Sequence, residues 1–161
     1  MPSNRTLYVS VTFNCVHNPD GSYGGSATYA QTGSEPADMG VLVDSDGSIH
    51  MDRAQAFDHN LYNENVDIVF NLASPATITP DNTTTQVVWA SVYGVGATIT
   101  VPEGGSATEF VVTPSPTNPN LLTISDKDDD SNTYNYKPAV ELPALNNYYI
   151  SLDPQIVNKP K

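Results

Sequence analysis

The residues best suited to chemistry lie in an acidic run, 126–132, where oxygen-bearing side chains occupy alternate positions. The four possible ligands are Asp126, Asp128, Asp130 and Asn132. Oxygen ligands at this spacing begin a calcium-binding loop. An EF-hand is excluded, because Ser131 stands where the loop needs glycine and Lys137 where it needs a bidentate glutamate. Two interpretations remain open, a calcium site and a solvated loop joining two strands.

Other arrangements that carry chemistry are weaker. A copper site would need Cys15 close in sequence to a histidine and a methionine on one late loop, and Cys15 lies near the first apolar segment instead. We expect Cys15 to be a buried, inert thiol. The chain contains no Gly-x-Ser-x-Gly, His-Glu-x-x-His or Gly-x-x-x-x-Gly-Lys motif. We therefore predict no enzymatic activity, although a hydrolytic triad assembled only in the folded chain stays open.

Aromatic side chains divide by the face on which their strands place them. Those expected inside are Trp89, Tyr134, Tyr136 and Tyr148. Tyr8 and Tyr149 fall on outward positions and are the predicted interaction residues, since tyrosine is enriched where proteins meet. A carbohydrate-binding module that uses the acidic run, with Trp89 as a stacking surface, is the alternative.

Charge restricts the partners. Six Lys and Arg residues stand against 18 Asp and Glu residues, the net charge is −12, and residues 54–126 contain no Lys or Arg. This sign opposes binding to the phosphates of nucleic acids or to an anionic membrane surface. No apolar run approaches the roughly 18 residues that cross a bilayer. We expect a protein partner or a second copy of the chain, and no cofactor other than possible calcium.

The length of 161 residues favours a single domain, 1–161, with residues 155–161 as a short tail. One cysteine excludes an intramolecular disulfide, and the first residues show no basic and then apolar leader. Cytoplasmic localisation is therefore expected. A secreted protein from which the leader peptide had been removed would show the same pattern.

Composition and periodicity predict an all-β fold. Pro, Gly, Asn, Asp, Ser and Thr are abundant, and Val, Thr and Tyr outnumber good helix formers. Apolar residues alternate in short segments separated by turn residues, which is typical of an antiparallel β-sandwich of about ten short strands. The expected strands are 7–13, 27–31, 39–43, 48–51, 64–72, 86–91, 97–101, 109–113, 121–125, 133–142 and 148–152.

Three local expectations accompany this fold. Asp44 to Gly47 predicts a tight turn joining the strands 39–43 and 48–51 into a hairpin. Residues 52–63 could form one or two helical turns. Pro138 cannot donate to a sheet ladder, so the strand 133–142 is expected at an edge or with a bulge.

The last third of the chain carries elements of a known family. They are the segments 121–126, 134–136 and 150–159. The most telling is a strand that closes on Asp153 and Pro154 before an Ile-Val-Asn run, and Glu35 with Pro36 matches a second signature dipeptide. Over the carboxyl-terminal stretch that these segments span, about a quarter to a third of its length, the chain resembles the DP-EP family of small bacterial β-sandwich proteins. A more distant likeness is to inclusion-body proteins of the PixA and AidA type. The resemblance implies an immunoglobulin-like sandwich and supplies no catalytic residue.

The sequence thus predicts an acidic, non-enzymatic β-sandwich that acts through protein–protein contacts or self-association. The charge and acidic loops would keep exposed strand edges from pairing indiscriminately.

Overall fold

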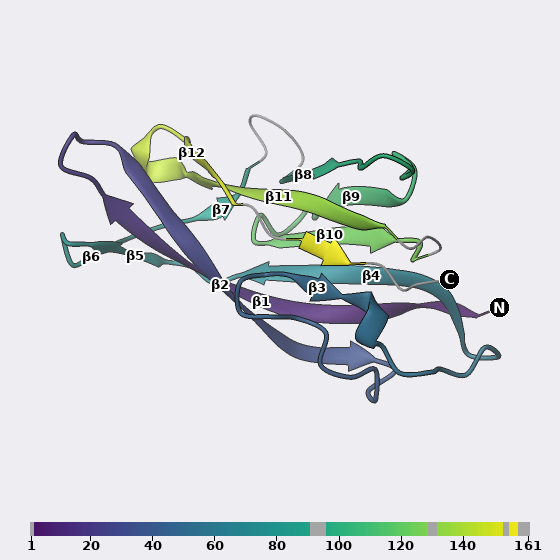
Figure 1. Ribbon diagram of the computed structural model, residues 1–161. Helices are drawn as coiled ribbons and strands as arrows, with labels where there is room; N and C mark the ends of the chain where they lie inside the picture. The colour runs from purple at the N-terminus through teal and green to yellow at the C-terminus, as the bar shows by residue number, and fades with distance from the viewer. Residues whose placement is uncertain (1, 91–95, 129–131, 153–154, 158–161) are drawn as a thin grey trace.

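The computed structural model describes residues 2–90, 96–128, 132–152 and 155–157, which form two β-sheets lying one above the other (Figure 1). The seven strands of the first sheet are β1 (Ser3–His17), β2 (Tyr23–Glu35), β4 (Tyr62–Leu72), β5 (Ala76–Thr79), β6 (Thr83–Thr85), β9 (Phe110–Pro114) and β10 (Leu121–Asp126). The six of the second are β3 (Ile49–His50), β7 (Val88–Trp89), β8 (Ala97–Thr100), β11 (Thr133–Leu142), β12 (Tyr148–Ser151) and β13 (Gln155–Val157). Two short 3-10 turns, Met51–Arg53 and Pro143–Leu145, complete the described elements, and none of these residues forms a helix able to cross a bilayer.

β1 organises the seven-stranded sheet. Its odd-numbered residues from Arg5 to Cys15 are buried and its even-numbered residues face outward, as in a strand with one buried face. On one side β2 pairs with it antiparallel from Thr6 to His17, with a shift of register between Tyr8 and Val9. On the other side β4 and then β5 pair with it in parallel, with Leu7 opposite Ile68 and Cys15 opposite Ile78. β10 and β9 extend the sheet beyond β4, and β6 extends it beyond β5.

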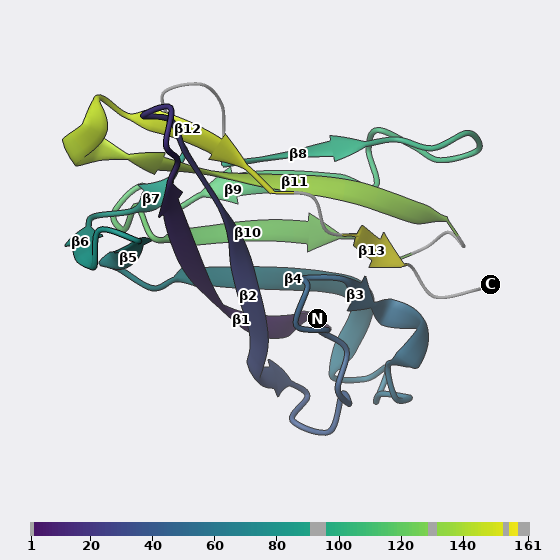
Figure 2. The same cartoon turned by 60° about the vertical axis from the view of Figure 1, so that its left-hand side comes forward.

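β11 organises the six-stranded sheet. β12 and β13 pair with its one side, and β7 and β8 pair with the other, so that Val140 faces both Ile150 and Trp89. β3 adds to β13 in parallel. Figure 2 shows β11 lying across β9, β10 and β4 of the other sheet.

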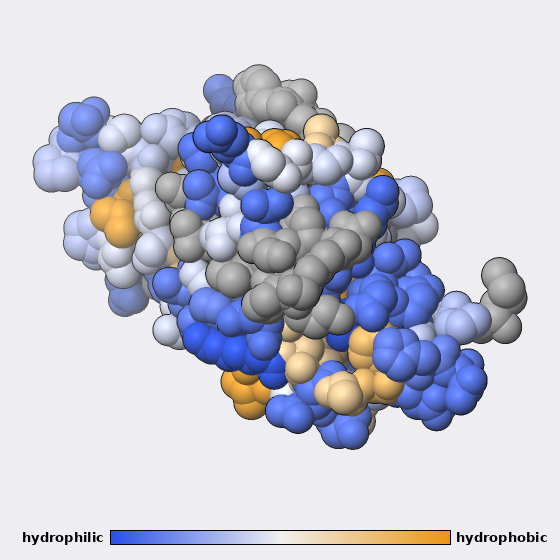
Figure 3. Space-filling view, turned by 45° about the vertical axis from the view of Figure 1, so that its right-hand side comes forward, coloured by the Kyte–Doolittle hydropathy of each residue, from blue (hydrophilic) through white to orange (hydrophobic). Residues whose placement is uncertain are grey.

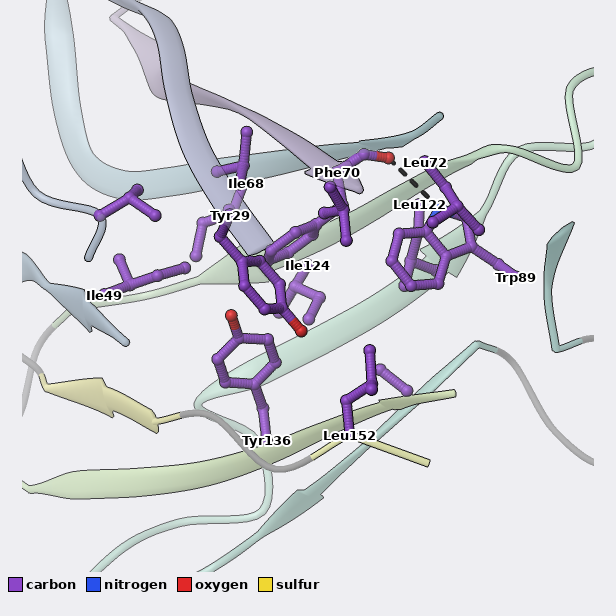
Figure 4. Close-up of a cluster of buried hydrophobic side chains, with 14 of the residues drawn as sticks. Tyr29, Ile49, Ile68, Phe70, Leu72, Trp89, Leu122, Ile124, Tyr136 and Leu152 are labelled. Carbon is purple, nitrogen blue, oxygen red and sulfur yellow. Dashed lines mark hydrogen bonds between the residues drawn. The ribbon is translucent and has the colours of Figure 1, made fainter. Parts of the chain in front are cut away.

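The core lies between the two sheets. Phe70 of β4 contacts Trp89 edge-on, with ring centroids 6.4 Å apart, and lies 5.7 Å from the ring of Tyr136 (Figure 4). Leu122 and Ile124 of β10 are fully buried beside them. The expected inward positions of Trp89, Tyr134 and Tyr136 are confirmed by exposures of 3%, 0% and 0%. Cys15 is also fully buried, as predicted.

The prediction of a purely antiparallel sandwich of about ten strands is wrong in two respects. The first sheet is mixed, because β1 pairs in parallel with β4 and with β5, and β3 and β13 add a parallel pair to the second. Thirteen strands occur in the described residues, among them β5 and β6, which lie in a segment expected to be a loop. Parallel pairing joins strands distant in sequence, so local alternation does not report it.

Three further expectations need correction. Residues 155–157 form β13 between β11 and β3, so they are not part of a tail. The expected helical turns in 52–63 reduce to the 3-10 turn Met51–Arg53. The expected hairpin has its turn at residues 44–47. Of its two expected strands, only β3 is present, and Val43 contributes a single bridge to Ile49.

Pro138 does not mark an edge, because β11 is paired on both sides. It lies where the neighbours of β11 change from β8 and β13 to β7 and β12. Its carbonyl oxygen still accepts from the backbone N–H of Leu152 at 2.7 Å. The missing N–H therefore falls at a discontinuity between neighbouring strands.

Candidate functional site

Asp126 lies inside the protein at the end of β10. It follows Leu122 and Ile124 on the buried face of the strand and has no exposed surface. Its Oδ1 accepts from the backbone N–H of Asp128 at 2.9 Å, and its carboxyl group lies within hydrogen-bonding reach of the buried carboxyl of Glu109. Burial raises the pKa of Asp126 to about 8, and the charges of Asp128 and the buried Glu109 add to the effect. Asp126 is therefore predominantly neutral at pH 7.

Asp128 is buried beside it and is neutralised by an arginine from the first strand. The Oδ2 of Asp128 lies 3.1 Å from Nη2 of Arg5, and the two side chains are 0% and 1% exposed. The same Nη2 donates to the backbone carbonyl of Glu64 at 2.7 Å. Arg5 lies on the inward-facing side of β1, two positions before Leu7. This ion pair connects the start of β1 to the segment after β10.

A cavity of about 290 Å³ borders Arg5 and is lined by Phe57, His59, Glu64 and residues 54–56. The guanidinium carbon of Arg5 lies 4.4 Å from the centre of the Phe57 ring, a cation–π distance. The ring of His59 lies tilted against that of Phe57, with centroids 4.4 Å apart. Because Arg5 is already engaged by Asp128, by the Glu64 carbonyl and by Phe57, it offers little charge to a ligand in this cavity.

The four residues predicted to bind calcium do not meet around one point in the described part of the chain. Asp126 is a buried carboxyl group and Asp128 is in an ion pair. The Nδ2 of Asn132 donates to the carbonyl of Gly104 at 3.1 Å, and Asp130 lies outside the described residues. Among the described side chains, no three of His, Cys, Asp and Glu are grouped so as to hold a metal ion.

Trp89 fills the core rather than a binding surface. Its indole N–H donates to the backbone carbonyls of Asn120 at 3.0 Å and of Phe70 at 3.4 Å. A cavity of about 160 Å³ lies between Trp89 and the proline-rich segment 114–119, but Trp89 itself is only 3% exposed. The stacking surface that the carbohydrate alternative requires is therefore covered.

The histidines form ion pairs or ring contacts. His17 lies 2.8 Å from Asp81 and stacks on Tyr23. His50 lies 2.9 Å from Asp44, and its other ring nitrogen lies 3.6 Å from Asp52. In the described residues no serine hydroxyl is hydrogen-bonded to either imidazole, so these contacts give no support to an assembled Ser-His-Asp triad.

The outward side of the seven-stranded sheet is a broad surface, which we call the outer face. Residues opposite each other in a pair of strands share one side of the sheet. The outer face consists of Thr6, Tyr8, Ser10, Thr12, Asn14, Val16, Ser26, Thr28, Ala30, Glu35, Asp67, Val69, Asn71, Thr77, Thr79, Thr84, Val111, Thr113, Leu121, Thr123 and Ser125. Each of these residues is exposed or half-buried.

The outer face is poor in charge. Glu35 and Asp67 are its only ionisable carboxyl side chains, and Asp67 accepts hydrogen bonds from Asn4 and Ser125. The remaining residues carry hydroxyl, amide or small apolar side chains. On the side of the molecule shown in Figure 3, hydrophilic residues cover much of the coloured surface. The face thus carries two carboxylates and no Lys or Arg side chain.

Tyr8 and Tyr149 are exposed by 37% and 44% and point outward, as their positions in the sequence predict. They do not share a surface. Tyr8 lies within the outer face, between Gly33 and Val69, whereas Tyr149 belongs to β12 of the other sheet. Their role in protein contacts stays a prediction.

Sequence reasoning missed the buried group formed by Arg5, Glu109, Asp126 and Asp128. A signal was present for two of them. Arg5 has the parity of Leu7, and Asp126 has the parity of Ile124, so both continue the buried face of a strand. Charged residues at inward positions indicate buried, paired groups. No family model matches this chain, and no curated protein is significantly similar to it.

Proposed function

We propose that this protein is a non-enzymatic binding protein that associates with a second copy of itself through the outer face. The observation that carries the proposal is a broad sheet surface of mainly hydroxyl, amide and apolar side chains, whose only two carboxylates are those of Glu35 and Asp67. Two strongly acidic chains repel each other most where their carboxylates meet. The outer face is the broad surface on which two copies could approach with the least repulsion.

The side chains of the outer face suit contact with an identical face. Serine and threonine hydroxyls both donate and accept hydrogen bonds, so a surface rich in them is complementary to itself across a two-fold axis. Tyr8, Val16 and Val111 add exposed apolar area, with exposures of 37%, 38% and 58%. Tyrosine contributes to such interfaces through a large, rigid side chain with one polar end.

The size of the face is sufficient. Its residues lie at alternate positions on strands about 4.8 Å apart with a rise of about 3.3 Å per residue, which gives a flat area of about 670 Å², and side chains that project from the sheet expose more than this. A stable protein interface buries about 800 Å² on each partner. A dimer could therefore form on this face alone.

We also propose that the two-sheet fold is a variant of the immunoglobulin-like sandwich, as the likeness to the DP-EP family implies. Its support is the pair of sheets packed around Trp89 and Phe70. The parallel pairs of β1 with β4 and β5 require the variant to have a mixed sheet.

Sedimentation equilibrium over a range of protein concentrations tests the self-association. We expect a reversible monomer–dimer equilibrium that shifts toward dimer as salt is added, because salt screens the repulsion between carboxylates around the contact. A monomer at every concentration and salt level would overturn the proposal.

A further inference from the structure

β2 is an edge strand, and only some of the backbone groups on its outer side have hydrogen-bond partners. Among the described residues it pairs with β1 alone. In an antiparallel pair, successive residues point their backbone N–H and C=O groups alternately toward the partner and away from it. The N–H of Tyr29 donates to the carbonyl of Ser45 at 3.0 Å, and that of Tyr23 donates to the hydroxyl of Tyr148 at 3.3 Å. Odd-numbered residues in this part of β2 therefore point away from β1.

Gly25 and Ala27 lie between these two satisfied positions and share their parity. By this alternation their amides point away from β1, and no loop, turn or side-chain hydrogen bond of the described residues reaches either amide. Free backbone groups on an edge strand form a template on which another strand can pair. The stretch of β2 that is open to pairing is short, because the amides of Tyr23 and Tyr29 at its two ends already have hydrogen-bond partners.

A cavity of about 340 Å³ runs along this stretch. It is lined by Gly25, Ser26, Ala27, Tyr29 and Asp46, and by Ser151 and Leu152 at the end of β12. Pairing with both Gly25 and Ala27 needs about three residues of extended chain, or about 10 Å. The cavity therefore leaves room for a short strand between β2 and the end of β12. Figure 2 shows β12 beside the end of the β1–β2 hairpin, on this side of the molecule.

Asp46 gives this cavity a charge preference. Its Oδ1 accepts from the backbone N–H of Ser48 at 2.9 Å, while Oδ2 has no hydrogen bond among the described residues, and the side chain is exposed. No Lys or Arg lines the cavity. In a chain of net charge −12, a segment that brings an ammonium group to Asp46 is favoured over an acidic one.

We propose that an extended, lysine-containing segment of another protein adds to β2 as a strand, pairing with the backbone of Gly25 and Ala27 and placing its ammonium group on Asp46. The backbone pairing supplies affinity, and the side chain on Asp46 supplies selectivity. The site lies on the edge of the sheet, so it does not depend on the self-association proposed for the outer face.

NMR titration of the ¹⁵N-labelled protein with the capped peptide Ac-Thr-Val-Lys-Val-Thr-NH₂ tests the site. We expect the amide protons of Gly25 and Ala27 to move downfield and to exchange more slowly, because they gain hydrogen bonds. Replacing the lysine of the peptide with glutamate should weaken binding by about two- to fivefold, because the contact that is lost involves the exposed carboxylate of Asp46.

Two variants and one control complete the test. Asp46→Asn should weaken the lysine peptide without affecting folding, and Ser151→Trp should block the cavity. Asp58→Asn is the matched control, because Asp58 is exposed and its Oδ1 also accepts from the backbone N–H two residues on, at 2.9 Å. The proposal is overturned if Gly25 and Ala27 do not respond, if Asp46→Asn and Asp58→Asn bind alike, or if the same amides are protected by raising the concentration of the protein alone, since the occupant would then be a second copy.

Discussion

Arg5 and Asp128, 123 positions apart in the sequence, form a buried ion pair, with 3.1 Å between Nη2 and Oδ2 and side chains that are 1% and 0% exposed. The pair joins the first strand of the seven-stranded sheet to the segment that follows β10. Phe57 covers the guanidinium group from the loop before β4. The start of β1, the segment after β10 and the loop before β4 therefore meet at Arg5, which the alternation of β1 places on the buried side of the strand.

Arg5→Met should destabilise the protein strongly, because it leaves the carboxylate of Asp128 buried without its partner. We expect a loss of about 3 to 5 kcal/mol in the free energy of unfolding, measured by urea denaturation. Arg53→Met is the control: Arg53 lies at the same distance, 3.1 Å, from Asp44, but both side chains are largely exposed. It should change stability far less. Equal losses in the two variants would show that burial does not set the strength of the Arg5 pair.

Asp126 should make stability depend on pH. In the unfolded chain this carboxyl has the usual aspartate pKa of 3.8, whereas the folded chain keeps its proton up to about pH 8. The stabilising contribution is therefore complete below pH 3.8 and decreases as the pH rises to about 8, with a slope of up to about 1.4 kcal/mol per pH unit. Asp126→Asn, which is neutral at every pH, should remove this slope from urea denaturation measured between about pH 5 and pH 8.

The exposed variant Asp58→Asn controls for the loss of a carboxylate as such. It should keep the pH dependence of the parent protein. If Asp126→Asn and the parent have parallel stability curves across this range, Asp126 is ionised in the folded chain and its burial has been misjudged.

The sequence predicts the strands that bury one face. Residues 7–13, 64–72, 121–125 and 133–142 alternate clearly, and the structure places a strand over each of them. It does not predict which strands become neighbours. The parallel pairs of β1 with β4 and β5 depend on contacts between segments far apart in the chain, and neither strand carries a local mark of its partner.

The short strands and the outer face are also hard to foresee. β5 and β6 are rich in threonine and lie beside prolines, so that turn signals hide them, and β13 has only three residues. Parity places Tyr8 outward. That its neighbours across the sheet would be Gly33 and Val69, with Thr123 beyond, follows only from the register.

Calcium should not stabilise the protein. Asp126 is neutral near pH 7 and Asp128 is held by Arg5, so the two described carboxyl groups of the acidic run are not free to bind a cation. A ligand that binds only the folded state adds about 2.7 kcal/mol at about 100 times its dissociation constant, which thermal unfolding detects. We expect no rise in the melting temperature with millimolar calcium. A rise that Asn132→Ala abolishes would restore the calcium interpretation.

The fluorescence of Trp89, the single tryptophan, should be that of a side chain buried in the core. Its exposure is 3% and its N–H donates to two backbone carbonyls, so its fluorescence should be shifted to short wavelength and resist quenching by acrylamide. Addition of mono- or oligosaccharides should leave the emission unchanged. A sugar-dependent change in intensity would favour the carbohydrate-binding alternative.

The most direct test of self-association through the outer face compares two threonine variants by sedimentation equilibrium. Thr123→Glu puts a negative charge beside Val69 on the outer face, whereas Thr98→Glu puts the same charge on the exposed side of β8 in the other sheet. Two copies brought face to face would then juxtapose like charges only in the first variant. We predict that Thr123→Glu remains folded and monomeric at concentrations where the parent and Thr98→Glu are dimeric. Dimerisation of Thr123→Glu with the affinity of the parent would contradict this account.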